Sequence, residues 1–322
     1  MVHIERLGPI VTPDTHPSIG KNIQGPSLIR VPDWVEDRLG RYYLYFADHK
    51  GEYIRLAYAD ELTGPWQVHA PGSLHLNDSL FPTDPPPVPE DGGAAAMASS
   101  RASMPGKRSH DFNVEATTTH IASPDVHVNE EERRIVMYFH GLEAFAKQAT
   151  RVAVSENGID FTTKPEILGR TYFRAFRHGD AVYALAMPGQ LYRSTDGYSN
   201  FETGPLIFNP DMRHAALLQR RNTLNVFWTQ VGHAPESILL STIDLSKDWT
   251  EWKDSEPVEV LRPENSWEGA DAPNEPSVRS TAYGIVNQLR DPAIYTENDE
   301  TYLLYAVGGE AGIAIARIDF DD

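Results

Sequence analysis

The feature that most constrains the fold of this chain is a pattern of short strand-like runs that recurs five times along it. Each copy has an apolar run that begins near Pro or His, a Tyr-rich run, a run of small residues and a closing Ser/Asp/Gly turn. Tyr, Val, Ile and Thr dominate these runs, as half-buried strands favour. Because four-stranded units repeated around an axis form a propeller, the sequence predicts an all-β fold, a five-bladed β-propeller with four-stranded antiparallel blades.

The repeat runs from end to end, so we expect one propeller domain over residues 1–322. The predicted blades cover about residues 25–69, 120–169, 172–212, 213–262 and 289–319. The fifth copy has no fourth strand, and the otherwise unused run at residues 3–11 has the right length to supply it. We therefore expect the N-terminal strand to close the ring by pairing residues 3–11 with residues 311–319.

Two insertions interrupt the repeat, at residues 70–119 and 262–289. Residues 82–110 of the first are so rich in Pro, Gly, Ala and Ser that a mobile loop without a packed element is expected. The second insertion carries aromatic and carboxylate side chains immediately before the fifth copy. Long insertions of that composition often line a site.

Composition excludes several classes of protein. The 322 residues carry a net charge of −18 and no cysteine, which argues against nucleic-acid partners and excludes disulfides. No apolar stretch approaches the ~20 residues that span a bilayer, so no membrane partner is expected. The start of the chain lacks the order of a signal peptide, which predicts a cytoplasmic protein. Oligomeric state does not follow from the sequence.

Propeller topology locates the polar residues that should converge. The inner strand of each blade begins at one mouth of the central channel, and the second strand ends at the same mouth. The residues at the two kinds of position are predominantly polar. They are Gln24, Ser123, Asp125, Arg174, His214, Arg290 and Asp291 at the strand starts, and His49, His140, Gln190, Gln230, His233 and Glu310 at the strand ends. A strand-start Asp can instead cap a turn, so single positions carry less weight than the cluster.

The blade pattern YYLYFADHKG…IRLAYADELTGPW, together with RDPAIY, resembles the five-bladed glycoside hydrolases of the arabinanase and β-xylosidase type, family 43. The resemblance implies a hydrolase that degrades oligosaccharides from a chain end with Asp and Glu as base and acid. Asp291 matches the family's Asp-Pro motif, whereas Asp125 follows its proline. Gln24 stands where the family commonly has the acid. The predicted acid is therefore Glu275, with Glu268 and Glu310 as alternatives.

The histidines favour a second reading. His49, His140 and His214 beside Arg174 or Arg290 suit proton abstraction next to a carboxylate, so a lyase or dehydratase acting on uronic-acid oligosaccharides is the alternative enzyme. A non-catalytic carbohydrate-binding propeller is a third reading. In each, an oligosaccharide is the partner, and Trp34 and Trp267 are the aromatics predicted to touch it. No cofactor is predicted; without an HxH or HxxxH pair, a divalent metal at the axis has no support.

Overall fold

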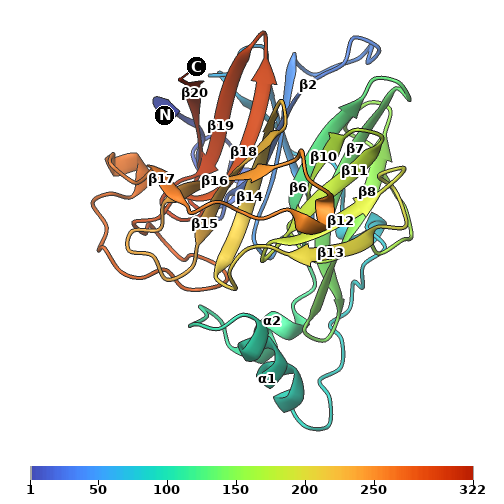
Figure 1. The fold of residues 1–322 in the computed structure, drawn as a ribbon, viewed down its shortest axis with the longest axis vertical. Helices are drawn as coiled ribbons and strands as arrows, with labels where there is room; N and C mark the ends of the chain where they lie inside the picture. Colours follow the sequence, from blue (N-terminus) through green and yellow to red (C-terminus); the bar gives the residue numbers. More distant parts are fainter. Residues whose placement is uncertain (1, 322) are drawn as a thin grey trace.

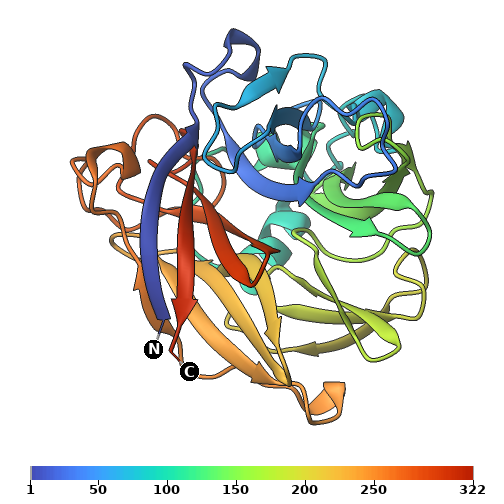
Figure 2. The same ribbon diagram turned by 90° about the horizontal axis from the view of Figure 1, so that it is seen from above.

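Five four-stranded antiparallel sheets arranged around a common axis make up the computed structural model, which describes residues 2–321 (Figures 1 and 2). The predicted five-bladed propeller is confirmed. The first blade holds β2 (Gln24–Arg30), β3 (Tyr42–Ala47), β4 (Arg55–Ala59) and β5 (Gln67–His69). The second holds β6 (Ile121–Asn129), β7 (Arg134–Ala144), β8 (Lys147–Ser155) and β9 (Thr162–Thr163).

The remaining blades follow in chain order. The third holds β10 (Arg174–His178), β11 (Ala181–Ala186), β12 (Gln190–Ser194) and β13 (Glu202–Leu206). The fourth holds β14 (Met212–Arg220), β15 (Thr223–Gln230), β16 (Ile238–Asp244) and β17 (Val258–Leu261). The fifth holds β18 (Arg290–Glu297), β19 (Glu300–Ala306), β20 (Ile313–Phe320) and β1 (Val2–Val11). The order within each sheet places β2, β6, β10, β14 and β18 at one edge, nearest the axis.

The N-terminal strand closes the ring as the sequence predicted. β1 pairs antiparallel with β20, so that Val2 lies opposite Phe320 and Val11 lies opposite Ile313. The two termini consequently lie side by side at the rim of the fifth blade (Figure 2). Closure of this kind joins the first and last segments of the chain in one sheet and covers the outer edge of β20.

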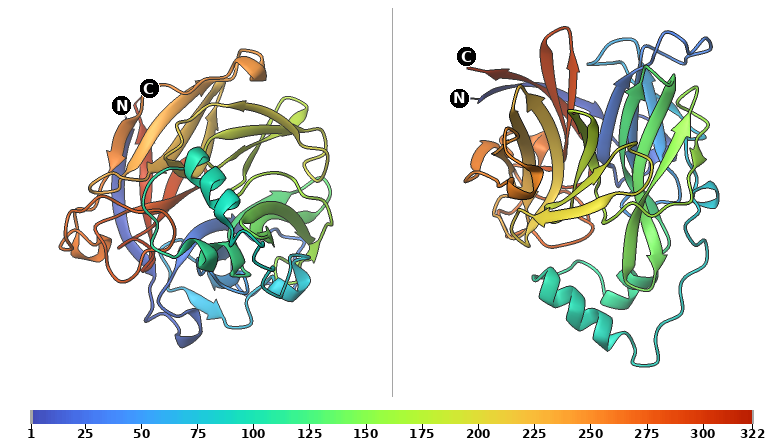
Figure 3. Two further views of the ribbon diagram at one scale, coloured as in Figure 1. Left: turned by 90° about the horizontal axis from the view of Figure 1, so that it is seen from below. Right: turned by 45° about the vertical axis from the view of Figure 1, so that its right-hand side comes forward.

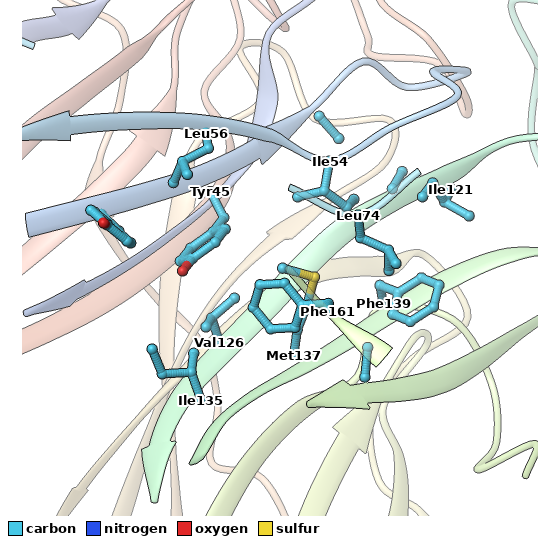
Figure 4. Packing of buried hydrophobic residues seen from close by; sticks show 14 of the residues in the cluster. Tyr45, Ile54, Leu56, Leu74, Ile121, Val126, Ile135, Met137, Phe139 and Phe161 are labelled. Carbon is cyan, nitrogen blue, oxygen red and sulfur yellow. The ribbon is translucent and has the colours of Figure 1, made fainter. Parts of the chain in front are cut away.

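Apolar side chains from neighbouring blades form the core between them. Figure 4 shows the cluster between the first two blades, in which Tyr45, Met137, Phe139 and Phe161 are all buried. The Tyr45 hydroxyl donates to the carbonyl of Gly158, 2.7 Å away, in the Ser/Asp-type turn of the second blade. The same contact recurs one blade on, where Tyr138 donates to the carbonyl of Gly197 at 2.8 Å. The repeat therefore preserves an inter-blade hydrogen bond as well as the strands.

The inter-blade turn yields a stability prediction. Gly158 has a φ of 76°, and a Cβ there would lie 2.8 Å from the Tyr45 hydroxyl. Gly179 has a comparable φ of 57° and open space around it. We expect Gly179→Ala to cost about 1 kcal/mol from backbone strain alone, and Gly158→Ala to cost roughly 2–3 kcal/mol because the added methyl also displaces Tyr45. Urea unfolding of the two variants measures this difference; equal losses would contradict it.

The insertion at residues 70–119 folds into helices, which corrects the expectation of an irregular loop. It contains a short 3-10 helix, η2 (Leu76–Asp78), and the helices α1 (Ala94–Ser103) and α2 (Phe112–Thr117). Asp91 accepts hydrogen bonds from the Gly93 and Ala95 amides, both at 2.9 Å, at the start of α1. Asp111 caps α2 in the same way. These capping aspartates were a helix signal that overall composition concealed.

Both helices lie below the ring, under the centre of the propeller (Figure 3). Three further 3-10 turns complete the secondary structure: η1 (Pro17–Ile19), η3 (Trp249–Glu251) and η4 (Ser266–Glu268). Within residues 2–321, no helix has the length and apolar character needed to cross a membrane. Residues of α1 and α2 line a cavity together with His49, His140 and His214 of the propeller.

Candidate functional site

One residue at the start of each inner strand has a positive φ. These five residues are Gly25, Ser123, Tyr172, His214 and Asp291, with φ values of 64°, 52°, 58°, 43° and 45°. In four blades the residue lies inside a register shift with the second strand, so it is a β-bulge. Side chains other than glycine rarely adopt this conformation, and bulky ones do so at a cost of about 1–3 kcal/mol. Backbone strain of this kind clusters at functional sites, so the mouth ringed by these five residues is the candidate site.

A cavity of about 320 Å³ lies at this mouth, between the strand starts and the helices below. We call it the helix-side cavity. Its volume falls in the range of about 300–1,000 Å³ that is usual for small-molecule sites. His49, His120, His140, Tyr172 and His214 line it from the propeller. Residues of α1, α2 and the segment between them line it from the other side. The predicted convergence of inner-strand starts and second-strand ends therefore occurs around this cavity.

His49, which is partly buried, contacts a fully buried carboxylate. Its Nδ1 lies 3.1 Å from Oε1 of Glu310, the oxygen that also accepts from Arg290 at 2.7 Å. The other oxygen, Oε2, accepts from Asn22 at 2.6 Å. Burial opposes ionisation of Glu310, but His49 and Arg290 hold its pKa down at about 2. An ionised carboxylate accepts hydrogen bonds, so in the neutral imidazole of His49 this contact places the proton on Nδ1 and leaves Nε2 as the acceptor nitrogen. A carboxylate that orients an imidazole in this way is the arrangement of a general base.

Asp291 has the opposite electrostatic environment. It is 1% exposed and lies behind the cavity wall, next to the lining residue His214, and neither carboxyl oxygen has a hydrogen-bond partner within residues 2–321. Burial, reinforced by the negative charge of Glu310, raises the pKa of Asp291 to about 7. Nε2 of His214 lies 3.6 Å from its Oδ1, and Nδ1 of His214 lies 3.0 Å from the Thr229 hydroxyl. A carboxyl group that stays protonated close to neutral pH can act as a general acid.

A row of aromatic rings leads from Asp291 along the cavity wall. The centroid of the Tyr172 ring lies 5.1 Å from that of His214 and 4.8 Å from that of His140, which in turn lies 5.9 Å from His120. Burial lowers the pKa of all three histidines well below the ordinary value. The three imidazoles are therefore neutral at pH 7. They offer polar ring nitrogens to a ligand without adding charge.

Behind the cavity, two buried arginines share a buried glutamate. Arg213 makes a two-pronged ion pair with Glu236, whose side chain is fully buried, and Nε of Arg290 lies 3.8 Å from the same carboxylate. Arg290 also donates twice to the side-chain oxygen of Gln288. This network fixes the guanidinium of Arg290 against Glu310. It thereby couples the packing of the fourth and fifth blades to the geometry of the His49–Glu310 pair.

The structure separates Asp125 from Asp291. Asp125 lines a second cavity, of about 650 Å³, between the far ends of the inner strands, which we call the opposite cavity. Its Oδ2 lies 2.8 Å from His127 Nε2 and accepts from the Ala175 amide at 2.8 Å. Arg174 also lines the opposite cavity and donates to the backbone carbonyls of Ala215 and Pro124. The two aspartates therefore do not face one another across a single ligand site.

Four other predicted residues also have definite places. Glu275 is exposed on the second insertion and lines neither cavity, so the structure does not bring it to Asp291. Trp267 packs against the core cluster of the fourth and fifth blades, and Trp34 packs against that of the first two. Neither indole lines the helix-side cavity or the opposite cavity. Gln24 is fully buried at the first strand start, with both amide atoms unpartnered within the described chain.

Within residues 2–321, no three His, Asp or Glu side chains are grouped so as to hold a metal ion.

No family model matches the chain. The chain is 35% identical over 323 aligned residues to a protein described as "Uncharacterized protein R118" from Acanthamoeba polyphaga mimivirus, in a match that covers 92% of this chain and 83% of the relative. This chain belongs to the family of R118. The description of R118 names no activity, so family membership assigns none.

Solved structures show which proteins share the fold of this R118-family member. A GH43_1 enzyme from Xanthomonas citri is similar with a TM-score of 0.56 and 12% identity, over 98% of this chain and 90% of that one. An α-L-arabinanase from Cellvibrio cellulosa, complexed with arabinohexaose, has a TM-score of 0.53 and 11% identity, over 93% of each chain. A thermostable family-43 glycoside hydrolase has a TM-score of 0.55 and 12% identity. The predicted resemblance to the family 43 propellers is confirmed as a likeness of fold.

Several residues of the site escaped prediction from the sequence of this R118-family protein. Tyr172 lies two residues before β10, whereas the other four positive-φ residues lie inside their inner strands, and no motif distinguishes it. Lys50 directly follows His49, a predicted site residue, so its position in the sequence was the one indication that this cation lies at the site. The others come from the segments around α1 and α2 or from the interiors of blades and insertions. They are Arg108, Glu115, Arg213, Glu236 and Arg279.

Proposed function

We propose that the protein is a glycoside hydrolase that cleaves the end of an oligosaccharide in the helix-side cavity. In this proposal Asp291 is the general acid and His49, oriented by Glu310, is the general base. The single observation that carries the proposal is the opposite environment of two buried carboxyl groups at one mouth. The pKa of Asp291 is raised to about 7, and that of Glu310 is lowered to about 2. Pairs of groups driven apart in this way commonly divide acid and base roles.

Two further observations support a saccharide as the substrate. The fold is that of proteins described as glycoside hydrolases, one of them complexed with arabinohexaose. The helices α1 and α2 lie below the ring of blades (Figure 1), and their residues line the cavity on that side. A confined cavity suits a chain end better than an internal segment, because an internal segment would need an open path on both sides.

The proposed reaction is a direct displacement by water. His49 Nε2 takes a proton from water while the water oxygen bonds to the anomeric carbon. The bond from that carbon to the glycosidic oxygen breaks, and Asp291 gives its proton to the departing oxygen. Glu115, the one carboxylate lining the cavity, is paired with Arg108 at 3.1 Å, which disfavours its use as a covalent nucleophile. Direct displacement inverts the anomeric configuration.

The test is mass spectrometry of neutral and acidic oligosaccharides incubated with the protein in ¹⁸O-labelled water. Hydrolysis gives fragments whose summed mass exceeds that of the substrate by one labelled water, with the label at the new reducing end. Proton NMR of the first product then reports the anomeric configuration, which we expect to be inverted. Sugar binding without cleavage of any panel member would instead support a carbohydrate-binding propeller.

A second candidate, β-elimination, is favoured by the orientation of His49. An imidazole base backed by a carboxylate can remove the proton next to the carboxylate of a uronic-acid residue. The electron pair of that C–H bond then forms a double bond as the bond to the departing oxygen breaks, and Asp291 protonates that oxygen. No water is consumed. Unlabelled fragments of unchanged summed mass, with ultraviolet absorbance from the new double bond, would establish this reaction in place of hydrolysis.

A further inference from the structure

We propose that the helix-side cavity selects a sugar carrying an anionic substituent, either a carboxylate or a sulfate or phosphate ester. Lys50, Arg108 and Arg279 are the groups that would contact it. The inference rests on the proposed function only in taking the ligand to be a sugar. It adds the chemical class of that sugar. It applies to hydrolysis and elimination alike, because both require the substrate to be bound in this cavity.

The charge of the cavity is opposite to that of the protein. The whole chain has a net charge of −18, yet six cationic side chains and one carboxylate line the cavity. The cationic residues are Lys50, Arg108, Lys147, Arg170, Arg213 and Arg279. A concave surface of one sign concentrates ligands of the other sign. Gathering cations in one cavity does not make an acidic protein more soluble. Binding of an anionic ligand does account for the cluster.

Lys50 is the cation most available to a ligand. Its ammonium group makes no hydrogen bond or ion pair among the described residues, although the residue is only partly exposed. Burial lowers the pKa of Lys50, while the charges of Glu115 and Glu310 oppose that shift. Removing a lysine from water without a partner is unfavourable, and an anionic group of a ligand would compensate for it. Lys50 also adjoins His49, the proposed base, in the sequence.

Arg108 and Arg279 are held side by side by the backbone. The Arg279 amide donates to the Lys107 carbonyl at 2.9 Å, and the Ser109 amide donates to the Arg279 carbonyl at 3.1 Å. Burial lowers the pKa of Arg279, and the charges of Arg108 and Arg213 add to that effect against the attraction of Asp211. Like charges brought together at a buried cavity wall repel one another. An anion between them would remove that repulsion, which is how arginine pairs recognise carboxylates and phosphates.

The carboxylates nearby do not neutralise the cluster. Glu115 pairs with Arg108, Asp211 pairs with Arg279 at 2.7 Å, and Glu236 pairs with Arg213. Lys50 and the exposed Arg170 and Lys147 have no such partner within the described chain. The cavity therefore keeps an excess of positive charge after its internal ion pairs are counted.

The experiment is calorimetric titration of the full chain with D-glucuronate, D-glucose 6-sulfate and D-glucose at low salt. We expect at least one charged sugar to bind roughly tenfold or more tightly than glucose, with the gap shrinking as salt is added. Lys50→Gln should reduce the gap several-fold, whereas Lys253→Gln, an exposed lysine remote from the cavity, should leave it unchanged. If Lys50→Gln folds poorly, Arg108→Gln is the alternative variant, and it should reduce the same difference in affinity. Arg108 lies between α1 and α2.

The outcomes separate this inference from the proposed function. A gap for glucuronate alone assigns a carboxylate, and a gap for the sulfate ester alone assigns an ester. No gap, or a gap that survives both Lys50→Gln and Arg108→Gln, overturns the inference. Because binding is read without turnover, selective binding with no cleavage of any oligosaccharide would overturn the proposed function alone. Cleavage of neutral oligosaccharides with no preference for charge would overturn this inference alone.

Discussion

Replacing Asp291 with asparagine is expected to lower turnover by at least roughly a hundredfold, the smaller end of what a general acid contributes. The amide has the shape of the carboxyl group but no acidic proton. In the wild-type protein the rate should fall as pH rises through about 7, because the pKa of Asp291 is raised to about 7 and only the protonated form donates. The residual activity of the variant should lack that alkaline limb. Initial rates across a pH series measure both effects.

The same substitution should stabilise the fold, which separates a catalytic role from a structural one. The ordinary pKa of the carboxyl is 3.8, and folding raises it to about 7. Folding therefore favours the protonated form, so the stability penalty is absent below pH 3.8, grows as pH rises, and is complete above pH 7. Above pH 7 we expect Asp291→Asn to be more stable than the wild type by on the order of a few kcal/mol. At pH 3.5 the two should be equal.

Asp254→Asn is the matched control for Asp291→Asn. Burial also raises the pKa of Asp254, but this residue lies between η3 and β17 in the outer part of the fourth blade, whereas Asp291 lies at the start of an inner strand. Its substitution should leave turnover within a few-fold of the wild type. If Asp291→Asn retained full activity, the acid assignment would be wrong, whatever its effect on unfolding.

Glu236→Gln is expected to cost about 3–5 kcal/mol of stability, because it removes one partner of a buried ion pair and leaves Arg213 and Arg290 without their shared charge. Burial opposes ionisation of Glu236, yet Arg213 and Arg290 hold its pKa below the usual value. Its contribution is therefore present above the unfolded pKa and is lost as pH falls through the folded one. Urea unfolding at pH 7 and in acid should show a large difference that shrinks in acid.

Glu259→Gln supplies the comparison for Glu236→Gln. Glu259 lies on β17 of the same blade and pairs with Arg262 at 2.6 Å, but both side chains are substantially exposed, at 36% and 53%. Surface pairs contribute little, so its loss should cost less than about 1 kcal/mol. Comparable losses for the two glutamines would mean that the buried network does not hold the fourth and fifth blades as described.

The bulge explains why Asp125 and Asp291 lie at different mouths although each stands next to a proline in an inner strand. The residue before the proline in Asp291-Pro292 is the bulge residue with positive φ, and the corresponding residue of the second blade is Ser123. Asp125 comes two residues later and lines the opposite cavity. A proline motif indicates a strand start, but the mouth to which each side chain turns depends on the backbone at the bulge.

In the second insertion, residues 262–289, the carboxylate named as an alternative acid has a structural role instead. Glu268 is fully buried, accepts from Arg6 of β1 at 2.9 Å and from the Tyr305 hydroxyl at 3.1 Å, and so helps to hold the closing strand. Glu268 therefore has a structural role, and so does Trp267, which packs against the core. The part of this insertion that reaches the cavity is Arg279 and Ser280. Carboxylate and aromatic content alone could not distinguish these two uses.

The sequence alone determined the propeller, its five blades, the closure by residues 3–11 and the mouth at which His49, His140, His214, Asp291 and Glu310 gather. Those features depend on strand periodicity and chain order, which are local or repeated properties. Only the tertiary structure decided which carboxyl is protonated, which cations face the cavity and that two helices cover it. Such properties depend on burial and on charges that meet across blades far apart in the chain, and no local pattern encodes those distances.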